Sequence, residues 1–392
     1  MKNKAVILGA NYYIGLSAIR CLGKNNVHVV AVDYSEKDSY AFNSKYIDEK
    51  LIGPHYKKDT KKFIEFLIDY GKKQKLKPVL FPTADPYVEV LDKYMDELRE
   101  YYLFPEIEKG LLTEIINKRS LEKLAVKHNV LIPETLKIGV DDFYKRVKEE
   151  IGYPCLVKPI NSHQFVSTFR RKMFKVYTKE ELKKVVDKVS KKGFEVIVQR
   201  LIKGFDDHMY TYDAYLNNDS KVTHSMTCQK QRQYPINFGA SVYTKQTNVE
   251  EIKKIGKKFL QEIGYKGFAE IEFKKDKETG NFYLIEINVR FSNLNVLLNK
   301  VGLNMPYITY KEAIGEDIVK NHIDKSTNIY FIYLYEDLLA IKNYIKTDQL
   351  TLLEVIKSYF NKKAYAIFSL DDIKPYFAFN KKIIKSIIKK IR

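Results

Sequence analysis

The segment Gly267–Arg290, GFAEIEFKKDKETGNFYLIEINVR, holds two runs of alternating apolar and polar residues on either side of a turn. Such alternation is typical of strands with one buried face, and it predicts strands over 268–274 and 282–288. Asp276–Gly280 between them carries the polar residues and the glycine that favour a tight connection. The segment therefore predicts a β-hairpin whose two strands face one core.

One face of this hairpin is rich in oxygen ligands. Successive side chains of a strand point to opposite sides, so Glu270 and Glu272 share a face. Glu286, Asn288 and Arg290 share a face of the second strand for the same reason. The remaining positions are apolar and would anchor the hairpin: Ile271, Phe273, Ile285, Ile287 and Val289.

Carboxylate and amide oxygens suit Mg²⁺, with Mn²⁺ as an alternative ion. Glu272, Glu286 and Asn288 are therefore predicted as metal ligands. The other interpretation is a solvated face with charged pairs on an edge hairpin, which an asparagine between apolar neighbours in a central strand disfavours.

Residues 5–100 alternate between strand and helix patterns, which predicts βαβ units around a parallel sheet. We therefore expect a Rossmann-like N-terminal domain over residues 1–109. Its expected strands are Ala5–Leu8, Val27–Val32 and Pro78–Phe81, and its expected helices are Ile14–Gly23, Phe63–Tyr70 and Tyr87–Tyr101.

The first turn of that domain, Gly9–Gly15, is similar to a dinucleotide-binding fingerprint, and Asp33 stands where a ribose-binding acid would. The turn has no middle glycine, which would let the backbone approach a pyrophosphate. We favour a plain strand-to-helix turn that binds no dinucleotide.

A second unit begins near residue 110. It is rich in strands with few parallel crossovers, which suggests an antiparallel sheet and an α+β region. Besides the hairpin, strands are expected over Gly152–Pro159, Lys172–Tyr177, Glu195–Ile202, Tyr210–Leu216 and Val222–Cys228, and helices over Leu111–His128, Lys179–Lys192 and Val249–Ile263.

The composition fits a soluble globular protein of two or three domains, with 392 residues, 45% hydrophobic and 30% charged. The net charge of +19 favours anionic partners, although the abundance of lysine also fits a genome-composition bias. No run of about 18 apolar residues is present, and no signal cleavage site follows the short apolar run after Met1. Cys21, Cys155 and Cys228 have neither metal-ligand nor disulfide spacing, so a reducing cytoplasm is expected.

The run Glu286-Ile-Asn288-Val-Arg290 resembles the E-x-N-x-R strand of the ATP-grasp superfamily. Lys118 and Lys158 resemble the two nucleotide-binding lysines of that family, in the expected order. The resemblance covers roughly residues 110–300 and extends more loosely to the N-terminal domain.

The resemblance implies an ATP-grasp domain over 110–320 that clasps ATP between two α+β subdomains, 110–203 and 204–320. A C-terminal extension would follow over 321–392.

The stretch around Gln199 resembles the hinge strand that clasps adenine in this family. There a side chain, here Gln199, and backbone groups, here the Arg200 carbonyl and the Ile202 N–H, would hold the base. Asp206 or Asp207 fits the acid that binds ribose a few residues later.

Lys158 is unusual even without the resemblance. It follows Cys155-Leu-Val and precedes Pro159, which is the context of a buried strand. An unpaired ammonium group there is costly, and a bound polyphosphate would supply its partner. A ligase that makes an acyl-phosphate builds charge on the transferring phosphoryl group, so cations are expected to cluster at that point.

One departure from the family lies in Ile160–Thr168, which has no glycine where many ATP-grasp enzymes have a glycine-rich loop. A backbone nest for phosphate is therefore in doubt. The Ser162-His163 pair is similar to carboxylate–amine ligases of the D-aspartate ligase type, where it would hydrogen-bond phosphate or form a structural loop.

Gln229–Gly239 resembles the same subgroup and is expected to follow a strand. Lys230 and Arg232 would alternate onto one face and meet the acyl-phosphate or a substrate carboxylate. The alternative is a basic loop on a basic protein.

These features predict an ATP-dependent carboxylate–amine ligase, with Arg290, Lys230 and Arg232 as catalytic residues. Its most specific form is D-aspartate-like ligation onto a cell-wall peptide precursor, with small molecules or peptide precursors as partners. A nucleic-acid-binding protein or a nucleotide-binding regulator without turnover is the alternative. The even spread of basic residues and the lack of a recognised module disfavour nucleic acid.

The C-terminus Lys381–Arg392 has helical spacing of isoleucines among lysines. A basic amphipathic helix of this kind lies on an anionic membrane surface or docks on its own protein. The predicted location is the cytoplasm, with the inner face of the membrane as a finer alternative. The apolar stripe consists of Ile383, Ile384, Ile387, Ile388 and Ile391.

Overall fold

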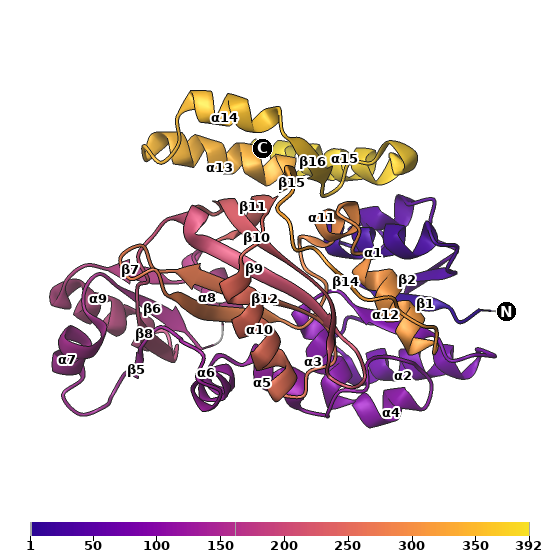
Figure 1. Ribbon diagram of the computed structural model, residues 1–392, viewed down its shortest axis with the longest axis horizontal. Coiled ribbons are helices and arrows are strands. Elements are labelled where there is room, and N and C mark those ends of the chain that lie inside the picture. The colour runs from indigo at the N-terminus through magenta and orange to yellow at the C-terminus, as the bar shows by residue number, and fades with distance from the viewer. Residues whose placement is uncertain (1, 161, 392) are drawn as a thin grey trace.

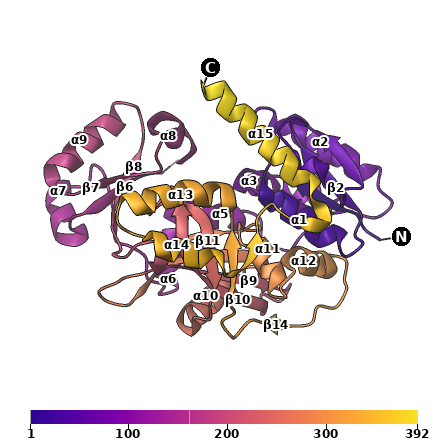
Figure 2. The same ribbon diagram turned by 90° about the horizontal axis from the view of Figure 1, so that it is seen from above.

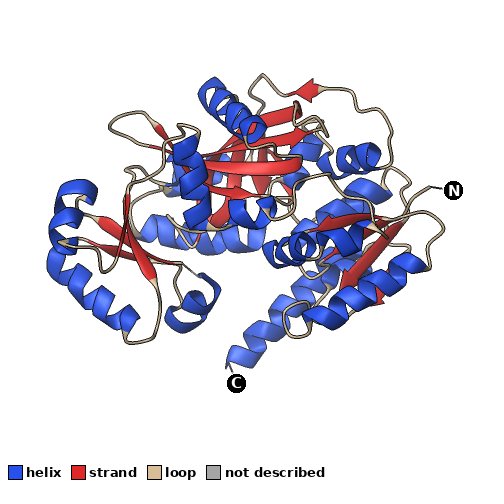
Figure 3. Ribbon diagram, turned by 90° about the horizontal axis from the view of Figure 1, so that it is seen from below, coloured by secondary structure: helices blue, strands red, loops and turns tan. Residues whose placement is uncertain are grey.

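The computed structural model describes residues 2–160 and 162–391, and three β-sheets follow one another across the molecule (Figure 3). A four-stranded sheet lies at the N-terminal end, an eight-stranded sheet in the middle and another four-stranded sheet at the far end (Figures 1 and 3). The predicted combination of α/β and α+β architecture is confirmed.

The N-terminal sheet has the order β3-β2-β1-β4, and all of its pairs are parallel. The helix predicted over 87–101 is divided at Tyr94 into α3 and α4. The elements are β1 (Ala5–Leu8), α1 (Tyr13–Gly23), β2 (Val29–Asp33), η1 (Tyr40–Asn43), β3 (Glu49–Ile52), α2 (Thr60–Lys72), β4 (Val79–Pro82), α3 (Asp85–Lys93) and α4 (Met95–Arg99).

The turn between β1 and α1 is closed by its own residues. The Asp33 carboxylate accepts hydrogen bonds from the N–H groups of Ala10 (2.7 Å) and Tyr34 (2.7 Å). A Cβ on Gly15 would lie 1.9 Å from the Gly9 carbonyl oxygen, so the second glycine is needed for close packing. These contacts support the plain turn over a dinucleotide site.

The small sheet has the order β5-β8-β6-β7 and is antiparallel throughout. Most of the segment predicted as a loop over 160–168 is helix α8, and the Ser162 and His163 side chains lie outside the described part. The elements are β5 (Thr135–Lys137), α7 (Phe143–Arg146), η2 (Val147–Ile151), β6 (Cys155–Pro159), α8 (Ser162–Phe169), β7 (Phe174–Val176), α9 (Lys179–Ser190) and β8 (Val196–Arg200).

The helix predicted over 111–128 is two helices, α5 (Leu111–Ile116) and α6 (Lys118–Lys127). Asn117 interrupts it with extended backbone, and its side chain accepts hydrogen bonds from the N–H groups of the next helix. Lys118 therefore stands at the first position of α6.

The large sheet runs β13-β12-β9-β10-β11-β15-β16, with β14 beside β10. Strands β9 to β13 pair antiparallel, while β14 and β16 add parallel pairs. Its elements are η3 (Asp206–His208), β9 (Met209–Leu216), β10 (Val222–Tyr234), β11 (Ala240–Gln246), α10 (Glu250–Glu262), β12 (Gly267–Lys275), β13 (Phe282–Asn288), α11 (Asn295–Lys300), α12 (Met305–Ala313), β14 (Asn321–His322), β15 (Ile329–Ile332) and β16 (Lys362–Tyr365).

Strand β10 is longer than predicted, because it continues past Cys228 to Tyr234. Its register against β11 shifts between Lys230 and Arg232 and again after Arg232. Such β-bulges re-aim side chains, so the predicted shared face of Lys230 and Arg232 is not found.

The remaining helices form one layer on the side drawn uppermost in Figure 1, and Figure 2 looks down on it. These helices are α13 (Leu334–Lys346), α14 (Leu352–Tyr359) and α15 (Lys374–Ile391), with the short η4 (Leu370–Asp372) between the last two. A buried ion pair from Arg20 to Asp372 (2.9 Å) joins this layer to α1. Among the described residues, none of the helices combines the length and apolarity needed to cross a bilayer.

Candidate active site

The hairpin β12–β13 brings the predicted metal ligands into register. Glu272 stands opposite Glu286, and Glu270 stands opposite Asn288. The Asn288 amide donates to Glu270 Oε1 at 2.9 Å. The predicted hairpin and its polar face are confirmed.

Lys230 of β10 reaches this face and donates from Nζ to Glu272 Oε2 at 2.6 Å. Burial is the largest effect on Glu272 and raises its pKa to about 7, against the opposing pull of Lys230. The carboxylates of Glu286 and Glu270 push that pKa in the same direction as burial does. The pKa of Lys230 is raised despite its burial, because three carboxylates surround it.

Glu286 behaves in the opposite way. The surrounding protein tends to raise its pKa, but Lys172, Lys230 and other nearby cations outweigh that effect and lower it. Lys118 is among these cations, so the first helix residue of α6 acts on the hairpin. The site therefore joins elements from both sides of the predicted ATP-grasp domain.

Arg290 lies just beyond β13 and connects three parts of the site. It donates to Asp85 Oδ1 of α3 at 2.7 Å and to the Asn288 side-chain oxygen at 3.1 Å. It also donates to the Phe291 carbonyl at 3.1 Å. Asp85, which no sequence motif marked, joins the N-terminal domain to Arg290 at the end of the β12–β13 hairpin.

Asp213 was missed as well. It lies on β9 opposite Glu270, is fully buried, and accepts a hydrogen bond from Thr211 at 2.8 Å. Burial and the charge of Glu270 raise its pKa well above the ordinary value. An aspartate in the apolar pattern of 209–216 is the sequence signal that would have marked it.

The two predicted phosphate lysines lie together at the end of β6. Lys158 donates to the Gln199 side-chain oxygen at 2.5 Å, and Lys118 donates to the Pro159 carbonyl at 3.3 Å. Burial and the charge of Lys118 lower the pKa of Lys158 to about 8, although Glu286 opposes this. Two cations are thus gathered where a polyphosphate would be stabilised.

The predicted adenine hinge is the end of β8. The Gln199 amide nitrogen donates to Thr135 Oγ1 at 3.1 Å, and Arg200 forms an ion pair with Glu134 at 3.0 Å. Ile202 is buried directly after the strand. The structure brings Gln199 to Lys158. The roles of Gln199, Arg200 and Ile202 in binding adenine remain a prediction.

The two candidate ribose acids differ. Asp206 is buried and accepts hydrogen bonds from Gln233, Tyr344 and the Asn237 N–H. Asp207 is exposed, and its carboxylate contacts the ring of the neighbouring His208 at 2.7 Å. Because the carboxylate oxygens of Asp206 already accept hydrogen bonds from within the protein, Asp207 is the better candidate for binding ribose.

Arg232 does not lie on the polar face of the β12–β13 hairpin. Its guanidinium donates to both oxygens of Asp337 on α13, at 2.6 and 2.9 Å, and is fully buried. It also stacks over the Tyr243 ring, 4.0 Å from the centroid. The β-bulges of β10 turn it toward the C-terminal layer, which corrects the expectation that it shares a face with Lys230.

Two further charged groups act on this region. The positive charge of Lys172, which precedes β7, lowers the pKa values of Glu286 on β13 and of Glu336 on α13. Burial raises the pKa of Glu336 to about 7, and Lys172 opposes that rise. No local sequence motif marks Lys172 or Glu336 as part of this region.

The donor set fits a Mg²⁺ ion that is shared with phosphate. Among the described residues, no three Asp, Glu, His or Cys side chains gather closely enough for an all-protein metal cage. Mg²⁺ usually takes only one or two carboxylates together with substrate phosphates, which Glu272 and Glu286 can supply on adjacent strands. Asn288 offers a neutral oxygen in the same register.

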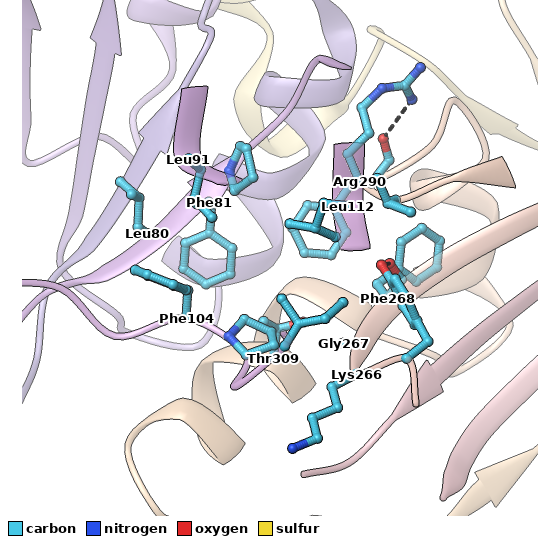
Figure 4. A pocket seen from close by; sticks show the side chains of 16 residues that line it. Leu80, Phe81, Leu91, Phe104, Leu112, Lys266, Gly267, Phe268, Arg290 and Thr309 are labelled. Carbon is cyan, nitrogen blue, oxygen red and sulfur yellow. Dashed lines mark hydrogen bonds between the residues drawn. The ribbon is translucent and has the colours of Figure 1, made fainter. Parts of the chain in front are cut away.

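An apolar cavity of about 70 Å³ lies behind this site, between β4 and the hairpin (Figure 4). Phe81, Leu112, Phe268 and Val289 are among its lining residues, together with Arg290. An apolar cavity does not suit a charged substrate, so we assign it to the junction between the N-terminal domain and the hairpin.

The chain is similar in sequence to known ligases. The family model "D-ala D-ala ligase C-terminus" matches residues 122–308. The D-aspartate ligase of Enterococcus faecium is 29% identical over 294 residues, which cover 71% of this chain and 69% of that protein. The D-alanine–D-alanine ligase B of Clostridium perfringens is 28% identical over 148 residues, or 37% of this chain and 47% of that ligase.

Solved structures agree on the fold. The biotin carboxylase domain of Hydrogenobacter thermophilus 2-oxoglutarate carboxylase, solved with MgADP and bicarbonate, has a TM-score of 0.65 at 19% identity over 84% of this chain and 74% of that one. N5-carboxyaminoimidazole synthetase of Staphylococcus aureus, solved with ADP, has a TM-score of 0.64 at 15% identity over 83% of this chain and 81% of that one.

The family-model match, the sequence relatives and the shared fold support an ATP-dependent carboxylate–amine ligase of the ATP-grasp type. The chain is similar in sequence to D-aspartate ligase and D-alanine–D-alanine ligase.

Proposed function

We propose that the enzyme phosphorylates a carboxylate with ATP and joins the acyl-phosphate to an amine. A carboxylate oxygen bonds to the γ-phosphorus as ADP leaves. The amine nitrogen then bonds to the carbonyl carbon while the carbon–oxygen bond to phosphate breaks, and the nitrogen loses a proton. The observation that carries this proposal is the convergence of Lys118, Lys158 and Lys230 on the carboxylates of the hairpin.

Each site residue has a proposed part. Lys118 and Lys158 bind the phosphates, while Lys230 and Arg290 stabilise the charge of the transferring group. Mg²⁺, or Mn²⁺ in its place, would be held by Glu272, Glu286 and Asn288 and would neutralise phosphate charge.

The nucleotide base and sugar would contact the end of β8 and the residues after it. We assign adenine to Gln199, the Arg200 carbonyl and the Ile202 N–H, and ribose to Asp207 ahead of Asp206. Arg232 is assigned a positioning part, since its ion pair with Asp337 holds β10 against α13.

We further propose D-aspartate-like ligation to a cell-wall peptide precursor, which the similarity to D-aspartate ligase supports. The proposed location is the cytoplasm, at the inner face of the membrane, with the basic tail Lys381–Arg392 near anionic lipid. The test incubates the full chain with ATP, Mg²⁺, an amino acid from a panel that includes D-aspartate and D-alanine, and a lysine-containing peptide. ADP release and an amide product that both need carboxylate and amine support the proposal; ADP release without any amide contradicts it.

A further inference from the structure

Exposed apolar side chains gather in the C-terminal layer. Of the 24 exposed large apolar side chains recorded for the described residues, 16 lie within Leu334–Ile388. Phe360 and Leu370 are each 85% exposed, and Leu352 is 64% exposed. A monomeric soluble protein rarely leaves so many apolar groups together in water unless they form a contact surface.

The same segment is strongly basic. Residues 334–392 contain 12 Lys and Arg against 6 Asp and Glu. Two of those acids, Asp337 and Asp372, are buried in ion pairs with arginines of other elements. The outer side of the layer is therefore more positive than the count alone indicates.

The exposed groups lie on α13, α14 and α15 and on the segments between these helices. On α14 only Val355 is buried, whereas Leu352, Leu353 and Ile356 are exposed. Figures 1 and 2 show α13, α14 and α15 along one side of the molecule. We use the term C-terminal face for the outward surface of these three helices.

Helix α15 changes character along its length. Its first half docks on the protein, where Phe379 packs on Tyr40 and Tyr333. Its second half leaves Ile384 and Ile388 exposed at 57% and 49%, between exposed lysines. The predicted docking of the tail on its own protein thus holds for the first half, while the second half remains uncovered among the described residues.

Charge decides between the possible occupants. A second copy would place one basic C-terminal face against another, because a twofold interface pairs the same patch with itself. An anionic bilayer supplies both acyl chains for the apolar groups and negative headgroups for the lysines.

We propose that the part of the C-terminal face formed by α14 and α15 binds an anionic lipid bilayer. The proposal deepens the location proposed above by naming the surface and the lipid class. It rests on no step of the ligase reaction, so vesicle binding and ATP turnover can fail independently.

The experiment is flotation of the full chain with vesicles of phosphatidylglycerol and phosphatidylcholine, or of phosphatidylcholine alone. We expect binding to the anionic vesicles at low salt and little binding to neutral ones. Binding should weaken at high salt, because the attraction of the lysines is screened within about 10 Å.

Two variants locate the contact. Leu353→Glu with Phe360→Glu removes exposed apolar groups of α14 and of the residue that follows it, and adds negative charge, so the vesicle partition should fall by about tenfold or more. Lys385→Glu with Lys389→Glu should act similarly on α15. The matched control Val126→Glu with Val319→Glu changes side chains that are 64% and 85% exposed on other elements, and it should bind as the unchanged chain does.

Three results would overturn the proposal. The full chain stays unbound with anionic vesicles, or the α14 and α15 variants bind as well as the control. The third is a dimer, measured by light scattering, that Phe360→Glu splits, because the face would then be an interface between copies. Unchanged ATP turnover in all variants would show that they remain folded.

Discussion

Strand β10 carries two buried cations two residues apart, Lys230 and Arg232, whose surroundings are very different. Arg232 meets both oxygens of Asp337 and stacks on Tyr243, so its charge and donors are matched within the scaffold. Lys230 meets one oxygen of Glu272 in a region that contains more carboxylates than its single charge can balance.

The difference separates scaffold from site. In a buried ion pair whose two charges neutralise each other, no ligand is needed to balance them, and the pair positions the elements that it joins. The face around Lys230 holds Asp213, Glu270, Glu272 and Glu286, and burial raises the pKa values of Asp213 and Glu272. Strongly perturbed groups that gather in this way mark a functional site.

The largest expected effect is on stability, at Arg232. Arg232→Met leaves the Asp337 carboxylate buried without its partner, and it should lower the free energy of unfolding by about 3–5 kcal/mol. The double variant Arg232→Met with Asp337→Leu removes both charges and should recover most of that loss. Urea denaturation followed by circular dichroism measures the stability of both variants. A double variant as unstable as the single one would contradict the view that Arg232 and Asp337 form a pair that is matched within the scaffold.

The next effect is on turnover, at the hairpin. Glu286→Gln or Asn288→Ala should reduce kcat by about 10²-fold or more, because phosphoryl charge is no longer neutralised in place. The unfolding midpoint of Glu286→Gln should stay unchanged. The matched controls are Glu278→Gln and Asn281→Ala, which alter exposed groups at the turn of the same hairpin. Near-normal Mg²⁺-dependent turnover in Glu286→Gln would remove the metal assignment.

A smaller effect is expected on nucleotide binding. Lys158→Ala removes a charged donor from the phosphates, so the Kd of a non-hydrolysable ATP analogue should rise by about tenfold or more. Calorimetric titration measures it, and Lys175→Ala on neighbouring β7 is the control. Equal affinity in the two variants would mean that Lys158 serves only the contact with Gln199.

The smallest effect concerns pH. Burial and Lys118 lower the pKa of Lys158 to about 8, so its ammonium group is lost as pH rises through that value. Affinity for the ATP analogue should therefore be full below pH 8 and should fall above it, by at most about tenfold per pH unit for one proton. Lys158→Ala should flatten this dependence. A flat profile in the unchanged chain would show that the lysine stays charged when nucleotide is absent.

Local sequence patterns predicted much of the fold. The alternation in 267–290 predicted the hairpin and its polar face because strand periodicity is a property of neighbouring residues. It could not predict that β10 continues past Cys228, because β-bulges interrupt the alternation at Lys230 and Arg232.

The missing site residues have a different cause. Asp85 reaches Arg290 from 205 residues away, and Asp337 reaches Arg232 across 105. Such pairs depend on tertiary packing and leave no periodic signal. Asp213 could have been identified from the sequence, because a carboxylate in a buried strand is costly unless it has a partner.

The central claim is that a carboxylate is activated as an acyl-phosphate at the β12–β13 face. Transfer of oxygen-18 tests it most directly, with D-aspartate labelled in its carboxylates, ATP, Mg²⁺ and an amine acceptor. If the carboxylate oxygen attacks phosphorus, each amide formed should release one phosphate that carries a single oxygen-18 atom, as mass spectrometry would show. Unlabelled phosphate released alongside amide would contradict the account.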